Sequence, residues 1–288
     1  AVEGEVYAMS SFFTAAVFWA IMRWEREADE PGANRWLLLI AYLMGLSVGV
    51  HMLNLLCIPA IGMIYYFKKF KPTTKGFIIA NLISVGVLGV IFKIIIPQAV
   101  SLAGKFELLF VNGLGMPFNS GTIVYFVLLI GGIVWGLIYT RKKNKPLWNT
   151  GILAVTFILI GYSTFMVLII RSNANPPIDE NNPEDAVGLL AYLNREQYGD
   201  WPILYGQYYN ASLDAREPYL DGNPIYVKDE AKGKYVISDD RKASVRNFEK
   251  KNSGFFPRMW STDQKHITQY KQWAGISAAD KGKPSFGE

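Results

Sequence analysis

Long uncharged runs of hydrophobic residues fill much of the first three fifths of the chain. A helix that crosses a bilayer needs about 20 mostly apolar residues. Four runs have roughly this length, and Lys93 is the one charged residue inside them. They cover residues 6–22, 77–97, 122–140 and 150–170. The pattern predicts a transmembrane helical domain over residues 1–170.

A fifth uncharged run, residues 36–67, is 32 residues long. One straight helix of that length would measure about 48 Å, against about 30 Å of hydrocarbon. The run therefore predicts two short helices that turn near residues 49–53, where Gly49, His51 and Asn54 offer a natural break. This gives about six crossings. If the run crosses only once, the number is five.

Positive charges predict which side of the membrane each loop faces. Two clusters of Lys and Arg without acidic neighbours flank the runs, and such clusters favour the cytoplasmic side. They are Lys68, Lys69, Lys71 and Lys75, and Arg141, Lys142, Lys143 and Lys145. The stretch between them, residues 98–121, holds only Lys105 and Glu107 and is expected to be an outer loop. Residues 23–35 carry both signs of charge and decide little.

Residues 171–288 are far more polar and predict a small α/β segment. They hold 16 of the 29 Lys and Arg and 17 of the 24 Asp and Glu. Asn182 and Pro183 predict a helix start, and Gly199 its end. Residues 224–228 and 234–238 predict a hairpin, and residues 262–274 a helix. The fold class is therefore mainly α: a polytopic membrane domain followed by a small extracytoplasmic α/β segment.

Several classes of protein lack support in the sequence. Cys57 is the only cysteine, so no disulfide can form within the chain, and His51 and His266 lack zinc-ligand spacing. The motifs of phosphate-binding loops, dinucleotide folds, serine hydrolases and zinc proteases are missing. The net charge of +5 does not indicate nucleic acid, because the densest basic clusters lie between apolar runs.

Glu3 and Glu5 are the first candidates for chemistry. They stand at the edge of the first run, where a carboxylate is costly unless it meets water, a partner or a substrate. Such a group could act as a general base. The alternative is a solvated helix start, where acids are stabilised by the helix dipole.

His51, Asn54 and Lys93 are candidates for binding. The first two could hold a headgroup or a sugar, or could instead satisfy backbone groups freed by the helix break. Lys93 could meet a lipid phosphate or merely extend to the interface.

The densest polar group follows the last run. Arg171 can pair with phosphate, and amide or acidic side chains suit sugar hydroxyls. The latter are Asn173, Asn175, Asp179 and Glu180. A connector that merely leaves a helix is the alternative. Whether a divalent metal is needed stays open.

Three stretches together resemble a known family. They are AVEGEVYAMSS at 1–11, GLSVGVHMLNLL at 45–56, and RSNANPPIDENNPEDA at 171–186, which runs on to LNREQYGD. They are similar to the multi-pass bacterial membrane proteins labelled domain of unknown function 2723. That family is similar to the GT-C superfamily of glycosyltransferases, which includes protein O-mannosyltransferases. The resemblance extends over essentially the whole chain.

This resemblance implies transfer of a sugar from a polyprenyl-phosphate donor to a hydroxyl, often of a protein Ser or Thr, at the outer face. An acidic residue of the first outer loop acts as base, and the anomeric configuration inverts. In the family that loop precedes the stretch matched by Glu5 and Tyr7. The resemblance therefore implies that this chain is an internal piece of a longer enzyme, with the principal base upstream.

The resemblance also implies roles for the candidates. Glu5, supported by Glu3 and Tyr7, would line the outer cavity. His51 and Asn54 would border it, and Lys93 and Arg171 would meet the carrier phosphate. Asn175, Asp179 and Glu180 would close over the donor or acceptor, and Asn173 would belong to the same substrate-binding group.

Two other functions remain open at this point. One is a non-enzymatic membrane anchor that presents the polar tail to a partner, and the other is a transporter of a lipid-linked sugar. The expected location is a bacterial inner membrane, with the tail in the periplasm. The expected partners are membrane lipid, the lipid-linked donor and a protein or glycan acceptor, with no nucleic acid. No cofactor beyond the donor is predicted.

Overall fold

The chain divides into two compact units in a computed structural model. The structure describes residues 2–177, 182–193, 202 and 204–275. Unit 1 comprises residues 1–193 and 230–234, and unit 2 comprises residues 194–229 and 235–288.

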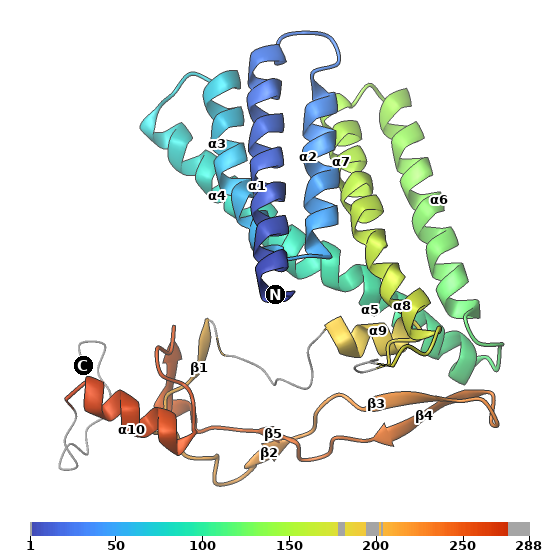
Figure 1. Ribbon diagram of the computed structural model, residues 1–288, viewed down its shortest axis with the longest axis vertical. Coiled ribbons are helices and arrows are strands. Elements are labelled where there is room, and N and C mark those ends of the chain that lie inside the picture. The colour runs from blue at the N-terminus through green and yellow to red at the C-terminus, as the bar shows by residue number, and fades with distance from the viewer. Residues whose placement is uncertain (1, 178–181, 194–201, 203, 276–288) are drawn as a thin grey trace. The chain divides into compact units, whose positions relative to one another are not determined.

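Unit 1 is a bundle of helices (Figure 1). In chain order they are α1 (Val2–Glu27), α2 (Asn34–Val48), η1 (Met52–Cys57), α3 (Ile58–Lys69), α4 (Thr74–Val90), η2 (Ile91–Ile95), α5 (Ile96–Leu108), η3 (Leu109–Gly113), α6 (Ser120–Lys142), α7 (Pro146–Tyr162), η4 (Ser163–Met166), α8 (Val167–Ser172) and α9 (Ala186–Leu193). In the described part of the chain, four helical stretches are long and apolar enough to cross a membrane. They are Val6–Glu27, Thr74–Gly113, Ser120–Lys142 and Pro146–Ser172. The structure therefore confirms a mainly helical domain with several helices long and apolar enough to span a membrane.

The break predicted within residues 36–67 is present. Helix α2 ends at Val48, Gly49 follows as its C-cap, and His51 is the N-cap of η1. Figure 1 shows that α2 and α3 then run in opposite directions. They contain 15 and 12 residues, which corresponds to about 22 Å and 18 Å. Each is shorter than the hydrocarbon core.

Most of the stretch expected to form an outer loop, residues 98–121, is helical. Thr74–Gly113 is one helical stretch of 40 residues, about 60 Å long. Pro97 has no N–H to donate to the carbonyl of Lys93, and the π-helical stretch η2 lies immediately before it. A π-helical turn lets a helix absorb such an irregularity and continue. The stretch without helix is confined to residues 114–119.

Glycines allow α2 and α7 to approach closely. A Cβ atom added to Gly45 would overlap the Ile158 carbonyl, and one added to Gly161 would lie 2.5 Å from the Tyr42 carbonyl oxygen. Small residues serve the same purpose wherever membrane helices pack backbone to backbone. Ile40, Met44 and Ile158 belong to the buried core around this contact, so the pair forms the centre of unit 1.

A buried carboxylate ties α5 to α6. Glu107 is fully buried. It accepts hydrogen bonds from the N–H groups of Asn119 at 2.5 Å and Thr122 at 2.9 Å, and from the Thr122 hydroxyl at 2.9 Å. These donors lie at the start of α6, where the helix dipole also favours a negative charge. Glu107 therefore fixes the turn between the two helices.

Unit 2 contains short antiparallel strand pairs and one helix. The strands are β1 (Tyr205–Gln207), β2 (Tyr219–Leu220), β3 (Ile225–Asp229), β4 (Lys234–Asp239), β5 (Val245–Arg246) and β6 (Ser253–Phe255), with η6 (Lys250–Asn252) before β6. The pairs are β1–β6, β2–β5 and β3–β4. Helix α10 (Gln264–Trp273) follows. The predicted hairpin and the predicted last helix are thus both present.

The helix predicted to start at Pro183 begins later. Helix α9 starts at Ala186, and the Asp185 carboxylate accepts from the N–H groups of Val187 at 2.9 Å and Gly188 at 2.8 Å. Asp185 is thus the capping residue in place of Asn182. The predicted end at Gly199 lies outside the described residues.

Replacing Gly161 by Ala should lower the free energy of unfolding by about 1–3 kcal/mol, because the new methyl group overlaps the α2 backbone. Thermal unfolding of the purified protein in detergent measures this. The matched control is Gly132→Ala on α6, where an added Cβ meets nothing within 4 Å. Equal melting temperatures for the two variants would contradict the close contact.

Replacing Glu107 by Gln should destabilise the protein by about 1–3 kcal/mol, since the amide cannot accept all three hydrogen bonds and leaves a buried donor unpaired. The same unfolding assay applies. Glu30→Gln, at an exposed position between α1 and α2, serves as control and should leave the melting temperature unchanged.

Candidate functional site

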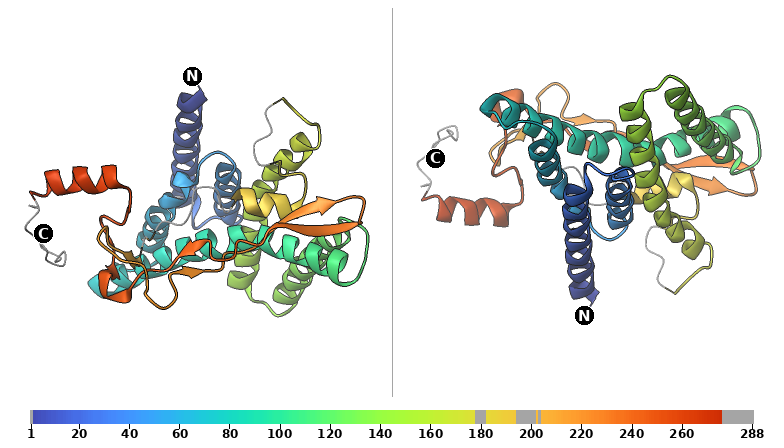
Figure 2. Two further views of the ribbon diagram at one scale, coloured as in Figure 1. Left: turned by 90° about the horizontal axis from the view of Figure 1, so that it is seen from below. Right: turned by 90° about the horizontal axis from the view of Figure 1, so that it is seen from above.

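Unit 1 has two chemically different ends (Figures 1 and 2). One end carries the three short connections α1–α2, α3–α4 and α6–α7, with both basic clusters. A hydrogen bond of 2.9 Å from Lys69 to Asp29 joins two of these connections. The opposite end holds the start of α1, η1, α5, α8 and α9. Most of the predicted site residues that the structure describes belong to this second end.

Tyr7 and His51 lie together at the second end. Their ring centroids are 5.9 Å apart, with the planes inclined by 41°. Tyr7 is 62% exposed, and His51 is partly exposed. The His51 Nδ1 atom accepts a hydrogen bond of 3.0 Å from the Leu53 N–H and so caps η1. His51 therefore stabilises the helix break and still presents its ring beside Tyr7.

Asn54 has its side chain fully inside the bundle. Its amide nitrogen donates to the Ser47 hydroxyl at 3.1 Å, and its amide oxygen accepts from the Thr14 hydroxyl at 3.3 Å. Ser47 in turn donates to the Met44 carbonyl at 2.8 Å. These bonds join α1, α2 and η1, so Asn54 holds the break in place from behind the exposed His51.

Glu3 and Glu5 lie in the first turns of α1. Tyr7 follows Glu3 by four residues and therefore shares its helix face. Ser10 follows Tyr7 by three residues; its hydroxyl is buried and has no hydrogen-bond partner in the described part of the chain. A buried polar group without a partner is uncommon in proteins. The Ser10 hydroxyl therefore leaves one hydrogen-bonding group of α1 unsatisfied among the described residues.

Lys93 lies in the π-helical stretch η2, and its side chain is exposed. Its ammonium group is 5.6 Å from the centre of the Phe92 ring. The Lys93 side chain is long and flexible, so its ammonium group can reach an anionic group at the membrane interface.

Arg171 is exposed at the end of α8. Its neighbour Asn173 donates to the Ile169 carbonyl and the Glu184 carbonyl, both at 2.8 Å. Asn175 has a positive φ of 48°, a conformation that Asn tolerates better than most residues. Asn173 and Asn175 thus shape the connector. Asp179 and Glu180 lie outside the described residues.

Sequence reasoning missed the polar residues that act from inside the bundle. The sequence predicts an outer loop around Glu107 and assigns no role to Ser47 or Thr14. A carboxylate inside a long apolar stretch is itself a signal, and it could have identified Glu107. In the described part of the chain, no three His, Cys, Asp or Glu side chains are grouped closely enough to hold a metal ion.

Two family comparisons match separate parts of the chain. Residues 1–74 match the family described as protein O-mannosyl-transferase TMEM260 N-terminal domain. Residues 199–288 match a family of unknown function, DUF8416. The first match covers α1 to α3 and includes Glu3, Glu5, Tyr7, His51 and Asn54. This match supports the resemblance to protein O-mannosyltransferases. The matching family is not domain of unknown function 2723. No curated protein and no solved structure matches the chain.

Replacing His51 by Ala should cost about 1 kcal/mol of stability, because η1 loses its capping acceptor. His51→Asn should retain most of the stability, since Asn is a good cap, while it removes the ring beside Tyr7. Chemical unfolding of both variants checks this. If the two variants lost equal stability, the capping role of His51 would be wrong.

Proposed function

We propose that this chain is part of a GT-C-type membrane glycosyltransferase that moves a sugar from a polyprenyl-phosphate donor to a hydroxyl acceptor, a protein Ser or Thr, at the outer face of a bacterial inner membrane. The observation that carries the proposal is the match of residues 1–74 to a protein O-mannosyltransferase domain. The same residues contain the exposed pair Tyr7 and His51 at one end of the bundle.

The proposed topology has six crossings: α1, α2, α3, α4, α6 and α7. Successive members of this series run in opposite directions (Figure 1). The salt bridge from Lys69 to Asp29 supports this arrangement, because it holds the connection after α1 at the same end as a basic cluster. The positive-inside rule then assigns that end to the cytoplasm. The end with Tyr7, His51 and the connector after α8 faces the periplasm.

The proposed chemistry is an inverting displacement. A carboxylate takes the proton from the acceptor hydroxyl, whose oxygen attacks the anomeric carbon. The bond from that carbon to the phosphate oxygen breaks, and the phosphate-bearing lipid leaves with the electron pair. Glu5 supports the base at the start of α1, and Glu3 lies in the same helical turn. Tyr7 and His51 supply the surface that the sugar meets, and Asn54 holds the helix break behind His51 in position.

The leaving phosphate needs a cation that reaches the membrane surface. Arg171 and Lys93 are exposed cations on α8 and η2, and Arg suits two-pronged phosphate binding. Asn173 and Asn175 shape the connector that follows Arg171. Asp179 and Glu180 complete the proposed acceptor side.

A non-enzymatic anchor is the second candidate. Its support is the separate family match of residues 199–288. Tyr205 and Phe255 form a cross-strand aromatic pair with centroids 5.2 Å apart, and both are at least half exposed. An anchor that presents this pair to a partner would need no carboxylate chemistry.

The test is sugar transfer by the whole protein that contains this chain, purified in lipid nanodiscs with a radiolabelled polyprenyl-phosphate sugar and a Ser/Thr-rich acceptor peptide. Glu5→Gln should lower kcat at least about tenfold, because groups that assist proton transfer contribute about 100-fold or more when optimally placed. The melting temperature should not change.

Glu30→Gln is the matched control, since it removes one carboxylate from the opposite end of the bundle. Transfer that is unchanged by Glu5→Gln would remove this residue from the site. No transfer by the unmodified protein, together with loss of partner binding in Tyr205→Ser, would favour the anchor.

A further inference from the structure

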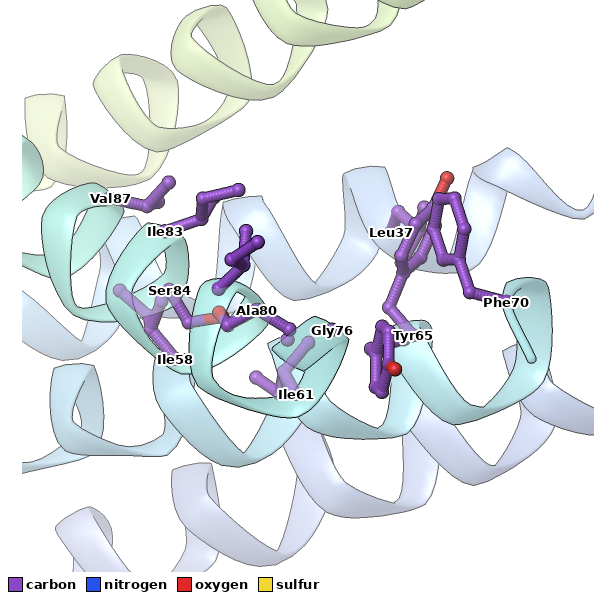
Figure 3. A pocket seen from close by; sticks show the side chains of 13 residues that line it. Leu37, Ile58, Ile61, Tyr65, Phe70, Gly76, Ala80, Ile83, Ser84 and Val87 are labelled. Carbon is purple, nitrogen blue, oxygen red and sulfur yellow. The ribbon is translucent and has the colours of Figure 1, made fainter. Parts of the chain in front are cut away.

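An apolar groove lies between α3 and α4 at the side of unit 1 (Figure 3). Its volume is about 600 Å³, within the range of about 300–1,000 Å³ typical of ligand sites. Leu37, Ile58, Tyr65, Phe70, Ile83 and Val87 are among its lining residues. From residue 58 to residue 70 the helix would extend about 18 Å, which is close to half of a hydrocarbon core of about 30 Å.

Two of the three side-chain hydroxyl groups in the groove wall, those of Tyr66 and Ser84, are already engaged. The Ser84 hydroxyl donates to the Ala80 carbonyl at 2.8 Å, and the Tyr66 hydroxyl accepts from the Thr73 N–H at 3.0 Å. Few polar atoms therefore remain to bind a hydrophilic ligand. The wall instead offers aliphatic and aromatic surface suited to a hydrocarbon chain.

Two unengaged lysines stand where the groove reaches the basic end of the bundle. Lys71 follows Phe70, and Lys75 precedes Gly76, so each is the chain neighbour of a lining residue. Both side chains are exposed, and neither has an ion pair or hydrogen bond with any described residue. The groove thus has a cationic mouth.

The neighbouring lysines behave differently. Lys69 donates to Asp29 at 2.9 Å and to the Ala28 carbonyl at 2.7 Å, and Lys68 lies 3.7 Å from the same carboxylate. These contacts hold the pKa of the Asp29 carboxyl below its usual value. Lys68 and Lys69 are therefore used within the protein, while Lys71 and Lys75 remain available to a ligand.

We propose that this groove binds one anionic phospholipid of the leaflet at the basic end. One acyl chain lies along α3 and α4, and the phosphate contacts Lys71 and Lys75. The positive charge of the mouth favours an anionic headgroup over a zwitterionic one. The apolar wall accommodates the acyl chain of the lipid. The cationic mouth of the groove lies at the opposite end of the bundle from Tyr7 and His51, and the proposed lipid binding does not depend on the proposed transferase activity.

The test uses the chain in nanodiscs that contain a small fraction of photoreactive lipid with a diazirine in the acyl chain. Phosphatidylglycerol and phosphatidylcholine with the same chain are compared, and adducts are mapped to helices by mass spectrometry. Labelling of α3 and α4 by phosphatidylglycerol should be at least about fivefold stronger than labelling by phosphatidylcholine. A fivefold ratio corresponds to the attraction of about 1 kcal/mol between one lysine and an anionic lipid surface.

The double variant Lys71→Ala/Lys75→Ala should abolish this preference. Lys142→Ala/Lys143→Ala removes two exposed charges from the other basic cluster at the same end. This control variant should keep the preference for phosphatidylglycerol. Ala80→Phe should fill the groove and reduce labelling by either lipid. Val127→Phe, at an exposed site on α6, is its control.

Three results would overturn the proposal: equal labelling by the two lipids, a preference that survives loss of both lysines, or labelling of α3 and α4 no stronger than that of α6. A further experiment tests whether a protein segment occupies the groove instead of a lipid. A photoreactive amino acid in place of Ile83, which lines the groove, should form adducts with lipid. Adducts with protein instead would show that another helix covers the groove.

Discussion

The fold of unit 1 depends on one constraint: a backbone group freed inside apolar surroundings must find a partner within the protein. The chain breaks its helices at several points, and polar side chains cap three of the helices that follow. His51 caps the break after α2, Glu107 caps the start of α6, and Asp185 caps the start of α9. Because these caps are specific, the breaks occur at fixed residues, and the helices that follow have fixed directions.

Close packing then converts those directions into a bundle. Gly45 and Gly161 let α2 and α7 meet backbone to backbone, and a Cβ on Gly62 would overlap the Ser84 hydroxyl between α3 and α4. Membrane helices gain little from burial against one another, so such small-residue contacts carry much of their association. Gly62 and Ser84 also line the apolar groove between α3 and α4.

The two ends of unit 1 therefore acquire separate chemistry. At one end the helix break exposes His51 beside Tyr7 and hides Asn54 behind them. At the other end, pairing with Asp29 engages Lys68 and Lys69 but leaves Lys71 and Lys75 free of partners in the described structure.

The sequence by itself determined the membrane class, the break near Gly49, the placement of both basic clusters and the hairpin over residues 225–239, because these follow from local periodicity, charge and turn chemistry. Two of the three stretches on which the family resemblance rests, residues 1–11 and 45–56, lie within the residues 1–74 that match a family model. Only the tertiary structure decided that residues 98–113 continue a helix, that Glu107 is a buried cap, and that Asp185 caps α9 in place of Asn182. These features depend on partners distant in the chain or on the choice between neighbouring caps of similar propensity. The energy that selects them comes from contacts that exist only after the helices have packed.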